Sequence, residues 1–323
     1  MDADESSRAS IIQLASRTNQ ASATATTRGA VIEVYENGLS FVDQVGLMRG
    51  YLSSGGFLGL VGVALGVYAS VKLGASWLLL LQLLLLFIAL LFIQIDWVGY
   101  RYEPVLFDCS SAKVHIFKSM GLPWWQWGWN IFGRPKSEVQ SFDWDCVEAE
   151  VVCFTIFTGQ IPRRECSLVL SIKNEPGGAA EIQRVSVGPV FGYGDTSGAI
   201  ERWEYVRRFM EGSGPVWTPD EYRFRDFGTG FWESVTIGQP LIGPDCGANW
   251  RKGPLVGTFG LLSLIAFPIT AYAGICRYIS YRLKRTLTWP ESVKLSVGAG
   301  PLDDASVMAI HRANAGSNKV LRG

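Results

Sequence analysis

Charged residues are scarce in this sequence, and that scarcity is the first indication of its class. Asp, Glu, Lys and Arg make up only 18% of the 323 residues, whereas soluble domains carry about a quarter. The 29 basic and 29 acidic residues balance, so no net charge attracts nucleic acid. Basic runs with interleaved aromatic residues are missing as well. We therefore expect a membrane protein that does not bind nucleic acid.

Histidine is nearly absent, and so are the motifs of catalysis. The only two are His115, in a stretch of strand-like alternation, and His311, in a polar tail. Catalysis by a Ser-His-Asp or Cys-His group would need one of them. Nucleotide-binding, nucleophile-elbow and zinc-protease motifs in the right context are also missing. We expect no enzyme activity, no catalytic residue, no cofactor and no metal site.

The cysteines show no CxxC pair and no spacing that defines a disulfide framework. We expect them to be small buried thiols. Unpaired cysteines favour a reducing compartment. The six are Cys109, Cys146, Cys153, Cys166, Cys246 and Cys276.

The N-terminus lacks the basic start and apolar core of a secretory signal. Residues 1–30 are polar and rich in Ser, Thr and Ala, and we expect a disordered tail there. A strand-forming segment follows over residues 31–50, around the turn residues Asn37 and Gly38. It can pair with later strands only if both lie on one side of the membrane.

Two long apolar runs contrast with these absences. Ser76–Ile95 is nearly all leucine and reaches the length of about 20 residues that a membrane span needs. Gly56–Val71 reaches that length when residues 51–55 are added. The connection between the two runs is too short for anything but a tight turn. We therefore predict a transmembrane helical hairpin over residues 51–97.

Small residues mark one side of the first helix of this hairpin. Such residues let another backbone approach closely, and close packing drives helix association in lipid. They can pack against the second helix or, in a homodimer, against a second copy of the chain. Gln82 is the one deep polar group of the second helix and is expected to form a hydrogen bond across the pair. The small residues are Gly55, Gly59, Gly62 and Gly66.

A third apolar segment covers residues 254–276, after a connecting region over residues 216–253. It either spans the membrane or is re-entrant or interfacial, and Pro268 is expected to kink it. A basic helix and polar tail follow over residues 277–323. The basic residues that flank the apolar segments do not agree on which side of the membrane the middle domain lies. Because the cysteines favour the inside, we expect a multi-pass protein of the bacterial inner membrane with a cytoplasmic middle domain.

In the middle domain, residues 98–215, apolar and polar residues alternate with a period of two, as they do in β-strands. Its last part, residues 199–211, instead places Trp203, Val206 and Met210 at helical spacing, and Gly212 ends this helix. One amphipathic helix that closes a row of antiparallel strands predicts a pleckstrin-homology-like β domain. The fold class is thus an α+β membrane protein with a hairpin, this domain and a third membrane-associated helix. The expected strands are Tyr100–Phe107, Lys113–Lys118, Gln140–Phe154, Ser167–Lys173 and Ile182–Val187.

A tryptophan-rich loop is the first candidate contact site. Tryptophan is enriched at membrane–water interfaces, because its ring is apolar and its N–H needs a polar partner. Trp97, at the end of the second span, marks the same level. A protein-docking surface and an aromatic core remain as alternatives. The loop carries Trp124, Trp125, Trp127 and Trp129.

Two adjacent arginines in the closing helix, Arg207 and Arg208, are the second candidate site. They could bind a phosphate, a lipid headgroup or an acidic partner. Alternatively, they pair along the helix with Glu204 or Glu211.

Three stretches and the hairpin together resemble an uncharacterised family of bacterial inner-membrane proteins often found near type VI secretion gene clusters. The stretches are PVLFDCSSAKVHIF (Pro104–Phe117), WEYVRRFMEGSGP (Trp203–Pro215) and RLKRTLTWPESV (Arg282–Val293). Cys109 stands where the family pattern has a basic residue. The resemblance implies an immunity or accessory protein that binds a secreted toxin or secretion component, and it implies no catalytic residues. A membrane scaffold or lipid-headgroup sensor is the alternative function.

Overall fold

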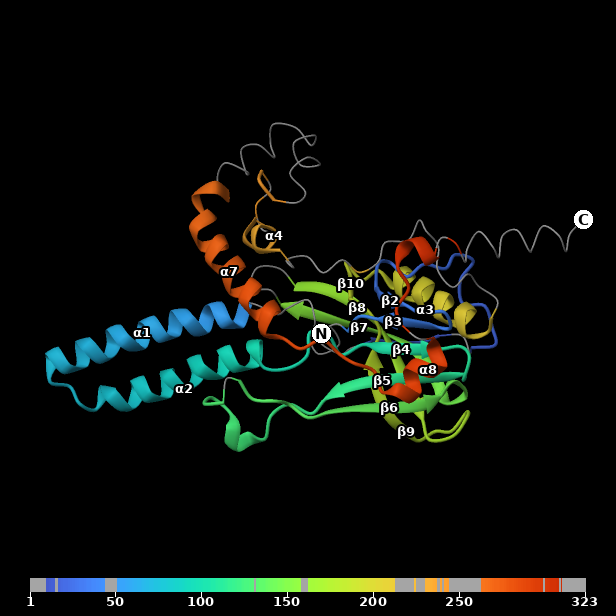
Figure 1. Cartoon of the computed structure of the whole chain (residues 1–323), viewed down its shortest axis with the longest axis horizontal. Coiled ribbons are helices and arrows are strands. Elements are labelled where there is room, and N and C mark those ends of the chain that lie inside the picture. The colour runs from blue at the N-terminus through green and yellow to red at the C-terminus, as the bar shows by residue number, and fades with distance from the viewer. Residues whose placement is uncertain are drawn as a thin grey trace, which may run out of the picture.

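The computed structural model describes residues 10–14, 17–43, 51–130, 132–157, 162–212, 224, 230–236, 239, 241–243, 263–298, 300–307 and 309. In this part of the chain, a pair of long helices projects from two antiparallel sheets, and a helical arm leaves the base of the pair (Figure 1). The mixed α+β class is therefore confirmed.

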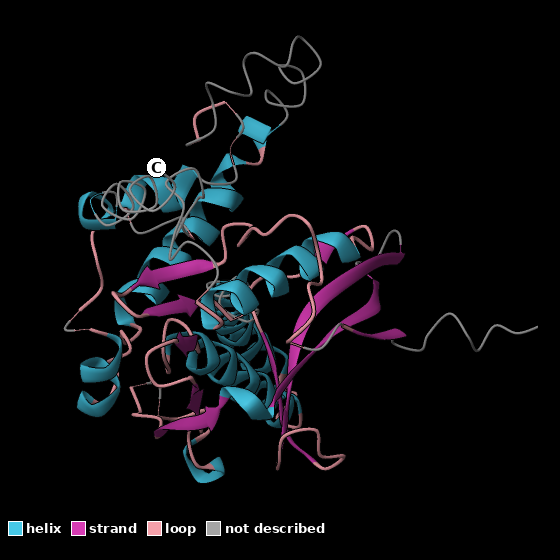
Figure 2. Ribbon diagram, turned by 90° about the vertical axis from the view of Figure 1, so that its right-hand side faces the viewer, coloured by secondary structure: helices cyan, strands magenta, loops and turns pink. Residues whose placement is uncertain are grey.

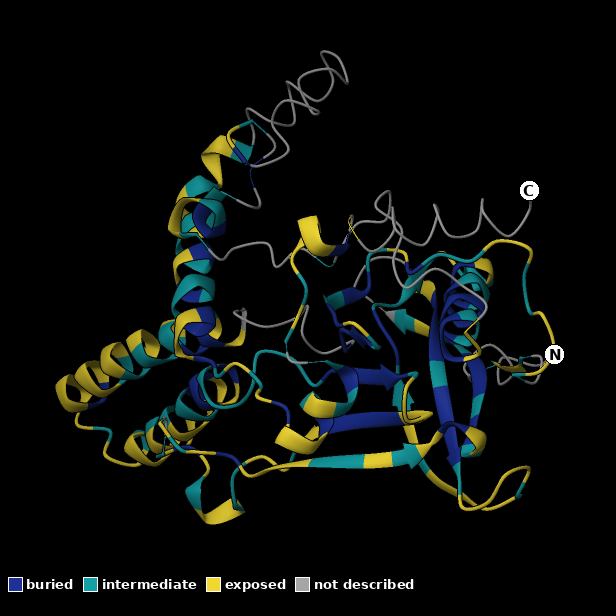
Figure 3. Cartoon of the chain, turned by 45° about the vertical axis from the view of Figure 1, so that its right-hand side comes forward, coloured by how far each residue is buried: buried dark blue, intermediate teal, exposed yellow. Residues whose placement is uncertain are grey.

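The projecting pair consists of α1 (Tyr51–Leu73) and α2 (Leu78–Trp97). Both helices are long and apolar enough to cross a membrane, and only 17% of each apolar window is buried inside the molecule. Figure 3 shows this exposure along the pair, in contrast to the buried strands. The core helix of a soluble protein would be mostly buried, and these two helices are not.

The glycines of α1 bring the two helices together at some positions only. A Cβ added at Gly59 would lie 3.0 Å from Ala89 Cβ, and one at Gly66 would lie 2.4 Å from Gln82 Nε2. Packing within the hairpin is thus confirmed for Gly59 and Gly66. Gly55 has only an ordinary contact with α2, and Gly62 faces open space. Gln82 was expected to form a hydrogen bond across the helix pair. For its Oε1 atom this prediction is wrong, because that atom accepts no hydrogen bond from the described residues.

The first sheet has five strands in the order β2-β3-β4-β5-β6. The hairpin is inserted between β3 and β4, which pair directly in the register Gly38↔Asp108 to Phe41↔Val105. Both ends of the hairpin therefore emerge on the same side. The strands are β2 (Val31–Val34), β3 (Gly38–Phe41), β4 (Val105–Asp108), β5 (Lys113–Ser119) and β6 (Ser137–Asp143).

The second sheet also has five strands, in the order β1-β7-β8-β10, with β9 pairing with β8 as well. Its strands are β1 (Ser10–Gln13), β7 (Val147–Phe157), β8 (Pro162–Lys173), β9 (Glu181–Ser186) and β10 (Phe191–Gly192). The expected single strand Gln140–Phe154 is wrong. A 3-10 turn, η3 (Trp144–Cys146), divides it, so that β6 and β7 belong to different sheets.

The expected closing helix is α3 (Thr196–Met210). It begins at Asp195, whose carboxylate accepts hydrogen bonds from the backbone N–H groups of Ser197 and Gly198, as an N-cap does. It contacts β7, β8 and β10 of one sheet and β4 of the other (Figure 2). Trp203 is fully buried in the core that both sheets share with this helix. The prediction of an amphipathic helix across open sheets is confirmed.

Part of the polar N-terminal segment is ordered, which corrects the expected tail over residues 1–30. Ser10–Gln13 pair with β7 as strand β1. Further along, the buried Arg202 donates a hydrogen bond to Thr27 O, and Glu204 accepts one from Ala21 N. The expectation rested on composition alone, and buried groups of α3 supply the partners that hold this polar stretch.

The structure describes the third apolar segment only from residue 263 onward. Its described part is α7 (Phe267–Leu283), and Pro268 lies in the first turn, where it begins the helix and does not kink it. Phe224 N donates to Val31 O, and α8 (Glu291–Val297) packs on Tyr35 and Leu106. The chain therefore contacts the same two-sheet domain before and after this segment. Residues 251–262 lie outside the described residues.

Two of the cysteines are paired, contrary to expectation. Cys153 and Cys166 lie opposite each other on β7 and β8 and form a disulfide. Cys109, Cys146 and Cys276 are free, and Cys246 lies outside the described residues. Disulfides persist in oxidising compartments, so the cysteines no longer support a cytoplasmic middle domain.

We predict that Glu204→Gln destabilises the two-sheet domain by roughly 3–5 kcal/mol, the usual cost of breaking a buried ion pair. Glu204 is fully buried and pairs with Arg207 and Arg208. The control is Glu201→Gln on the same helix, because Glu201 pairs with the more exposed Arg28. It should cost less than about 1 kcal/mol. Denaturant unfolding of the full chain in detergent measures both, and equal losses would contradict the assignment.

The same pair should respond to pH. Burial alone would raise the pKa of Glu204, but hydrogen bonds from Arg207, the backbone of Ala21 and Arg208 lower it to about 2. A lowered pKa gives stability that is present above the unfolded value and lost as the pH falls toward the folded one. Glu204→Gln should therefore weaken the loss of stability between about pH 4.5 and pH 2.

Candidate functional site

The base of the hairpin is organised around one buried carboxylate, that of Asp96. Its Oδ2 accepts a hydrogen bond from Ser53 N at 2.9 Å, in the first turn of α1. Its Oδ1 lies 3.8 Å from Lys284 Nζ, and its backbone oxygen accepts a bond from Ser280 Oγ at 2.9 Å. A carboxylate at a helix N-terminus is favoured by the helix dipole. Asp96 thus joins α1, α2 and the C-terminal end of α7.

The tryptophan-rich loop is attached to α2 by a second buried polar residue, Gln94. Its Nε2 donates to Gln126 O at 2.7 Å and to Asn130 O at 2.8 Å, while its Oε1 accepts from Gly128 N at 2.7 Å. The side-chain amide is 3% exposed. Because both of its polar atoms are used on the loop backbone, Gln94 fixes the loop against the helix.

Gly128 lets this loop approach α2 closely. Its φ of +76° is in the left-handed region, and an added Cβ would lie 2.6 Å from Phe87 Cε2. From Phe87 to Gln94 the helix rises by about 10 Å. The loop therefore covers the part of α2 nearest the sheets, and only glycine fits at this contact.

The four tryptophans of the loop point outward, so the aromatic-core interpretation is wrong. Trp127 Nε1 donates to Leu122 O and Trp129 Nε1 to Trp125 O. The N–H groups of Trp127 and Trp129 are thus paired within the loop while all four rings face outward, as expected for an interface or docking surface. The exposed fractions are 76% for Trp124, 58% for Trp125, 50% for Trp127 and 65% for Trp129.

The last predicted tryptophan, Trp97, lies at the end of α2 and is only partly exposed. Its ring contacts Phe57 of α1 at 5.5 Å and Phe132 of the loop at 6.4 Å between centroids. It connects the hairpin to the tryptophan-rich loop.

The helical arm presents a second exposed apolar surface. Short helix α4 (Phe231–Thr236) packs closely on α7, since a Cβ added at Gly274 would lie 2.4 Å from Ser234 O. Tyr272 Oη donates to Ser54 O at 2.8 Å and so holds α7 against α1. In Figures 1 and 3, α7 leaves the hairpin at a steep angle. The exposed side chains are Phe231, Trp232, Ile265 and Ile269.

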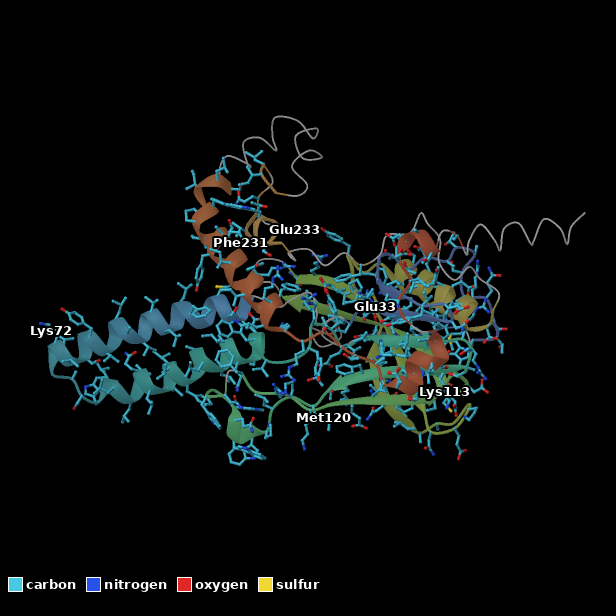
Figure 4. The ribbon with its side chains drawn as sticks, in the orientation of Figure 1. Glu33, Lys72, Lys113, Met120, Phe231 and Glu233 are labelled. Atoms are coloured by element: carbon cyan, nitrogen blue, oxygen red, sulfur yellow. A yellow bond between two sulfur atoms is a disulfide. The ribbon has the colours of Figure 1, made fainter. Side chains whose placement is uncertain are left out.

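The two exposed surfaces flank the base of the hairpin. Figure 4 places Met120, at the start of the tryptophan-rich loop, and Phe231, on α4, on opposite sides of that base. Sequence analysis identified the tryptophans but missed Gln94, Asp96 and the arm. A polar residue within an otherwise apolar run was the available signal for the first two.

The arginine pair does not form an open anion site. Arg207 donates through Nε and Nη2 to both carboxylate oxygens of Glu204, at 2.9 and 2.8 Å. Arg208 Nε donates to Glu204 Oε1 at 2.7 Å, and its Nη2 donates to Ser22 O and Ala23 O. The alternative of pairing along the helix is therefore confirmed with Glu204. The pair fixes the N-terminal segment on α3.

One polar group has the residue types of a hydrolase. His115 Nδ1 lies 2.7 Å from Ser141 Oγ, and His115 Nε2 lies 3.7 Å from Asp108 Oδ2. Asp108 is fully buried and is bonded by the hydroxyl groups of Ser110, Ser111 and Ser296. Burial lowers the pKa of His115, against the opposing effect of Asp108. Asp108 is thus engaged in fixing α8 on the sheet.

Two further observations bear on chemistry. Within the described ranges, no cluster of three or more His, Cys, Asp or Glu side chains is arranged to hold a metal ion. The described cavities are lined by residues at the base of the hairpin and around Arg101, away from Ser141.

Comparison with known proteins yields one match. The family described as "Family of unknown function (DUF6708)" matches residues 82–301. No curated protein and no solved structure matches the chain.

We predict that Gln94→Leu releases the tryptophan-rich loop while α2 remains helical. The backbone N–H of Gly128 and the carbonyls of Gln126 and Asn130 lose their partners, so amide hydrogen exchange at Gly128 should rise by about tenfold or more, on the scale of one lost hydrogen bond. The matched control is Gln82→Leu in the same helix, because Gln82 lies away from the loop. Equal exchange at Gly128 in both variants would contradict the role of Gln94.

Proposed function

Because the chain belongs to the DUF6708 family, whose function is unknown, its role is inferred from its own residues, and we propose a membrane-anchored binding protein without catalysis. The α1–α2 hairpin is the anchor, and the two sheets with α3 are the binding unit. The observation that carries the proposal is the pair of exposed apolar helices with an outward-facing tryptophan-rich loop fixed at its base by Gln94.

The position of the exposed aromatic residues supports this anchoring. The tryptophan-rich loop and the α4–α7 arm flank the part of the hairpin nearest the sheets, where a bilayer's headgroup layer would lie if the hairpin spans it. Tryptophan and other amphipathic rings are favoured at that level. An arm that lies across the hairpin would then rest along the membrane surface.

The proposed binding unit is of the pleckstrin-homology type. Support comes from the order of its elements, since antiparallel strands are followed by one helix that covers their shared core. Absence of catalysis is supported by the burial of His115 and by the use of Asp108 in fixing α8.

The biological role that we propose is that of an immunity or accessory protein of the bacterial inner membrane, associated with type VI secretion. The resemblance of the stretches Pro104–Phe117, Trp203–Pro215 and Arg282–Val293 supports it. The partner would be a secreted toxin or a secretion component. It would meet either the hairpin within the bilayer or the two-sheet domain beside it.

A membrane scaffold or lipid-headgroup sensor is the second candidate function. The tryptophan-rich loop favours it, because the loop exposes rings suited to the headgroup layer. Headgroup binding by Arg207 and Arg208 lacks support, since both bind Glu204 and the N-terminal segment. A homodimer would use the open side of α1 at Gly62.

Two observations bear on which side of the membrane the domain lies, and they disagree. Arg277 lies in the second half of α7, Arg282 in its last turn and Arg285 just beyond it. Lys72 lies at the far end of the hairpin (Figure 4). By the positive-inside rule, this distribution of charge supports a cytoplasmic domain. The Cys153–Cys166 disulfide points to the other side. We propose the cytoplasmic placement.

Labelling of single cysteines tests both the spanning hairpin and its orientation. In a chain whose six cysteines are replaced by Ser, Lys72→Cys should react with a membrane-impermeant maleimide in spheroplasts. Glu138→Cys, on exposed strand β6, should react only after permeabilisation. The reverse pattern would place the domain outside. Labelling of both positions in spheroplasts would contradict a spanning hairpin.

The immunity role predicts that deletion of the gene sensitises the cell to the toxin encoded beside it. Survival in competition with a strain that delivers this toxin should fall and should be restored by the intact gene. The deletion strain is also complemented with a gene that carries Gln94→Leu. If this variant restores survival less well than the intact gene does, the tryptophan-rich loop contributes to protection. Unchanged survival after deletion would contradict the immunity role.

A further inference from the structure

Gln82 differs from the other polar side chains of the α1–α2 hairpin in the use of its hydrogen-bonding groups. Ser70 Oγ donates to Gly66 O at 2.7 Å, and the side chains of Gln94 and Asp96 are bonded as described above. In Gln82, Oε1 is buried and accepts no hydrogen bond from the described residues, and Nε2 donates none to them. The amide therefore has an unused acceptor and unused donors.

The position of Gln82 in the hairpin makes this unusual. It is the fifth residue of α2, about 6 Å along the helix axis, and lies within the apolar window of that helix. In water, such an amide would bond to solvent. The hydrocarbon of a bilayer offers neither donor nor acceptor, so the amide loses its solvation without compensation. A spanning hairpin by itself is thus incomplete at Gln82.

The Gln82 amide borders an open strip on α1. It lies over Gly66, where an added Cβ would be 2.4 Å from Nε2 and 2.5 Å from Oε1. Gly62 lies one turn away on the same face of α1, because residues four apart are neighbours on a helix. A Cβ added at Gly62 would have nothing within 4 Å. We call this strip the Gly62 side. Another helix backbone can approach α1 closely there.

A second copy of the chain offers the groups that match this side. An amide contains both a donor and an acceptor, so two Gln82 side chains can bond to each other reciprocally. Two copies that are anchored in one bilayer with the same orientation are related by an axis along the membrane normal. Residues of the same number then lie at the same depth. Amide therefore meets amide, and each Gly62 side meets a surface that also lacks side chains.

We propose that two copies of the chain associate through the Gly62 sides of their hairpins, with the two Gln82 amides hydrogen-bonded to each other across the interface. The proposal rests on the membrane anchoring proposed above, because only lipid makes the unused amide costly. It names the bond that would hold a homodimer together. It also gives a role to a polar side chain that the fold of one copy leaves unused.

Energy transfer between copies tests this assignment. Full-length chains that carry a donor or an acceptor dye on a C-terminal tag are reconstituted together in phosphatidylcholine liposomes at a series of lipid-to-protein ratios. The wild-type chain should transfer energy above the level of random proximity, and the transfer should fall as lipid dilutes the chain. Gln82→Leu should associate roughly tenfold more weakly, on the scale of hydrogen bonds between membrane helices. Gln82→Asn, which keeps an amide, should associate more tightly than Gln82→Leu.

A second pair of variants tests the surface. Gly62→Leu should weaken association as Gln82→Leu does, because its side chain blocks the approach of the second copy. The hairpin itself has room for it, since a Cβ at Gly62 meets nothing. The matched control is Ala64→Leu, which adds the same side chain to the same helix. Ala64 is exposed and lies about 200° around α1 from Gly62, so this variant should associate as the wild type does.

Three results would overturn the pairing. They are a wild-type chain that is monomeric at every lipid ratio, association of Gln82→Leu as tight as that of the wild type, and equal weakening by Gly62→Leu and Ala64→Leu. Flotation of the same liposomes separates the pairing from the anchoring. A wild-type chain that floats with lipid but transfers no energy contradicts the pairing alone. A wild-type chain that does not float contradicts the anchoring and the pairing together.

Discussion

The arrangement of the molecule depends on the buried carboxylate of Asp96. It caps the N-terminus of α1, closes α2 and attracts Lys284 just beyond α7, so three helices meet at one charge. A buried charge is tolerated only when its partners are in place. The positions of the tryptophan-rich loop and the arm depend on Asp96 as well, because each is attached to a helix that Asp96 joins to the others.

Polar side chains within apolar helices have two different uses here. Gln94 and Asp96 lie near the sheets and organise neighbouring segments through bonds to backbone groups. Gln82 lies near the other end of α2, far from the sheets, and packs on Gly66. The same contrast applies to the arginines of α3, which stabilise the fold through Glu204 and the N-terminal segment. In this chain, polar residues that stand out in the sequence mostly fix parts of the chain to one another.

Local patterns predicted the hairpin, the closing helix and most strands, because each has a period of its own. Pairings between distant segments could not be predicted in this way. The 3-10 turn at Trp144–Cys146 divides β6 from β7, which belong to different sheets. This division depends on the packing of Trp144 against Trp203, which the local sequence pattern does not reveal. Likewise, Ser10–Gln13 become a strand only because β7 offers an edge. The four tryptophans were predicted as a membrane interface, a docking surface or an aromatic core, and their exposure contradicts only the core. Gln94, which fixes their loop, was not identified.

The insertion of the hairpin between β3 and β4 has a consequence for biosynthesis. Leu39 of β3 pairs with Phe107 of β4. Because α1 and α2 lie between these residues in sequence, both helices are synthesised before Phe107. Pairings between residues so far apart in sequence form slowly. The sheet is therefore completed only after the apolar helices have emerged, so insertion of the hairpin into lipid would precede closure of the domain. A nascent chain held back from the membrane would leave β2 and β3 as an open edge.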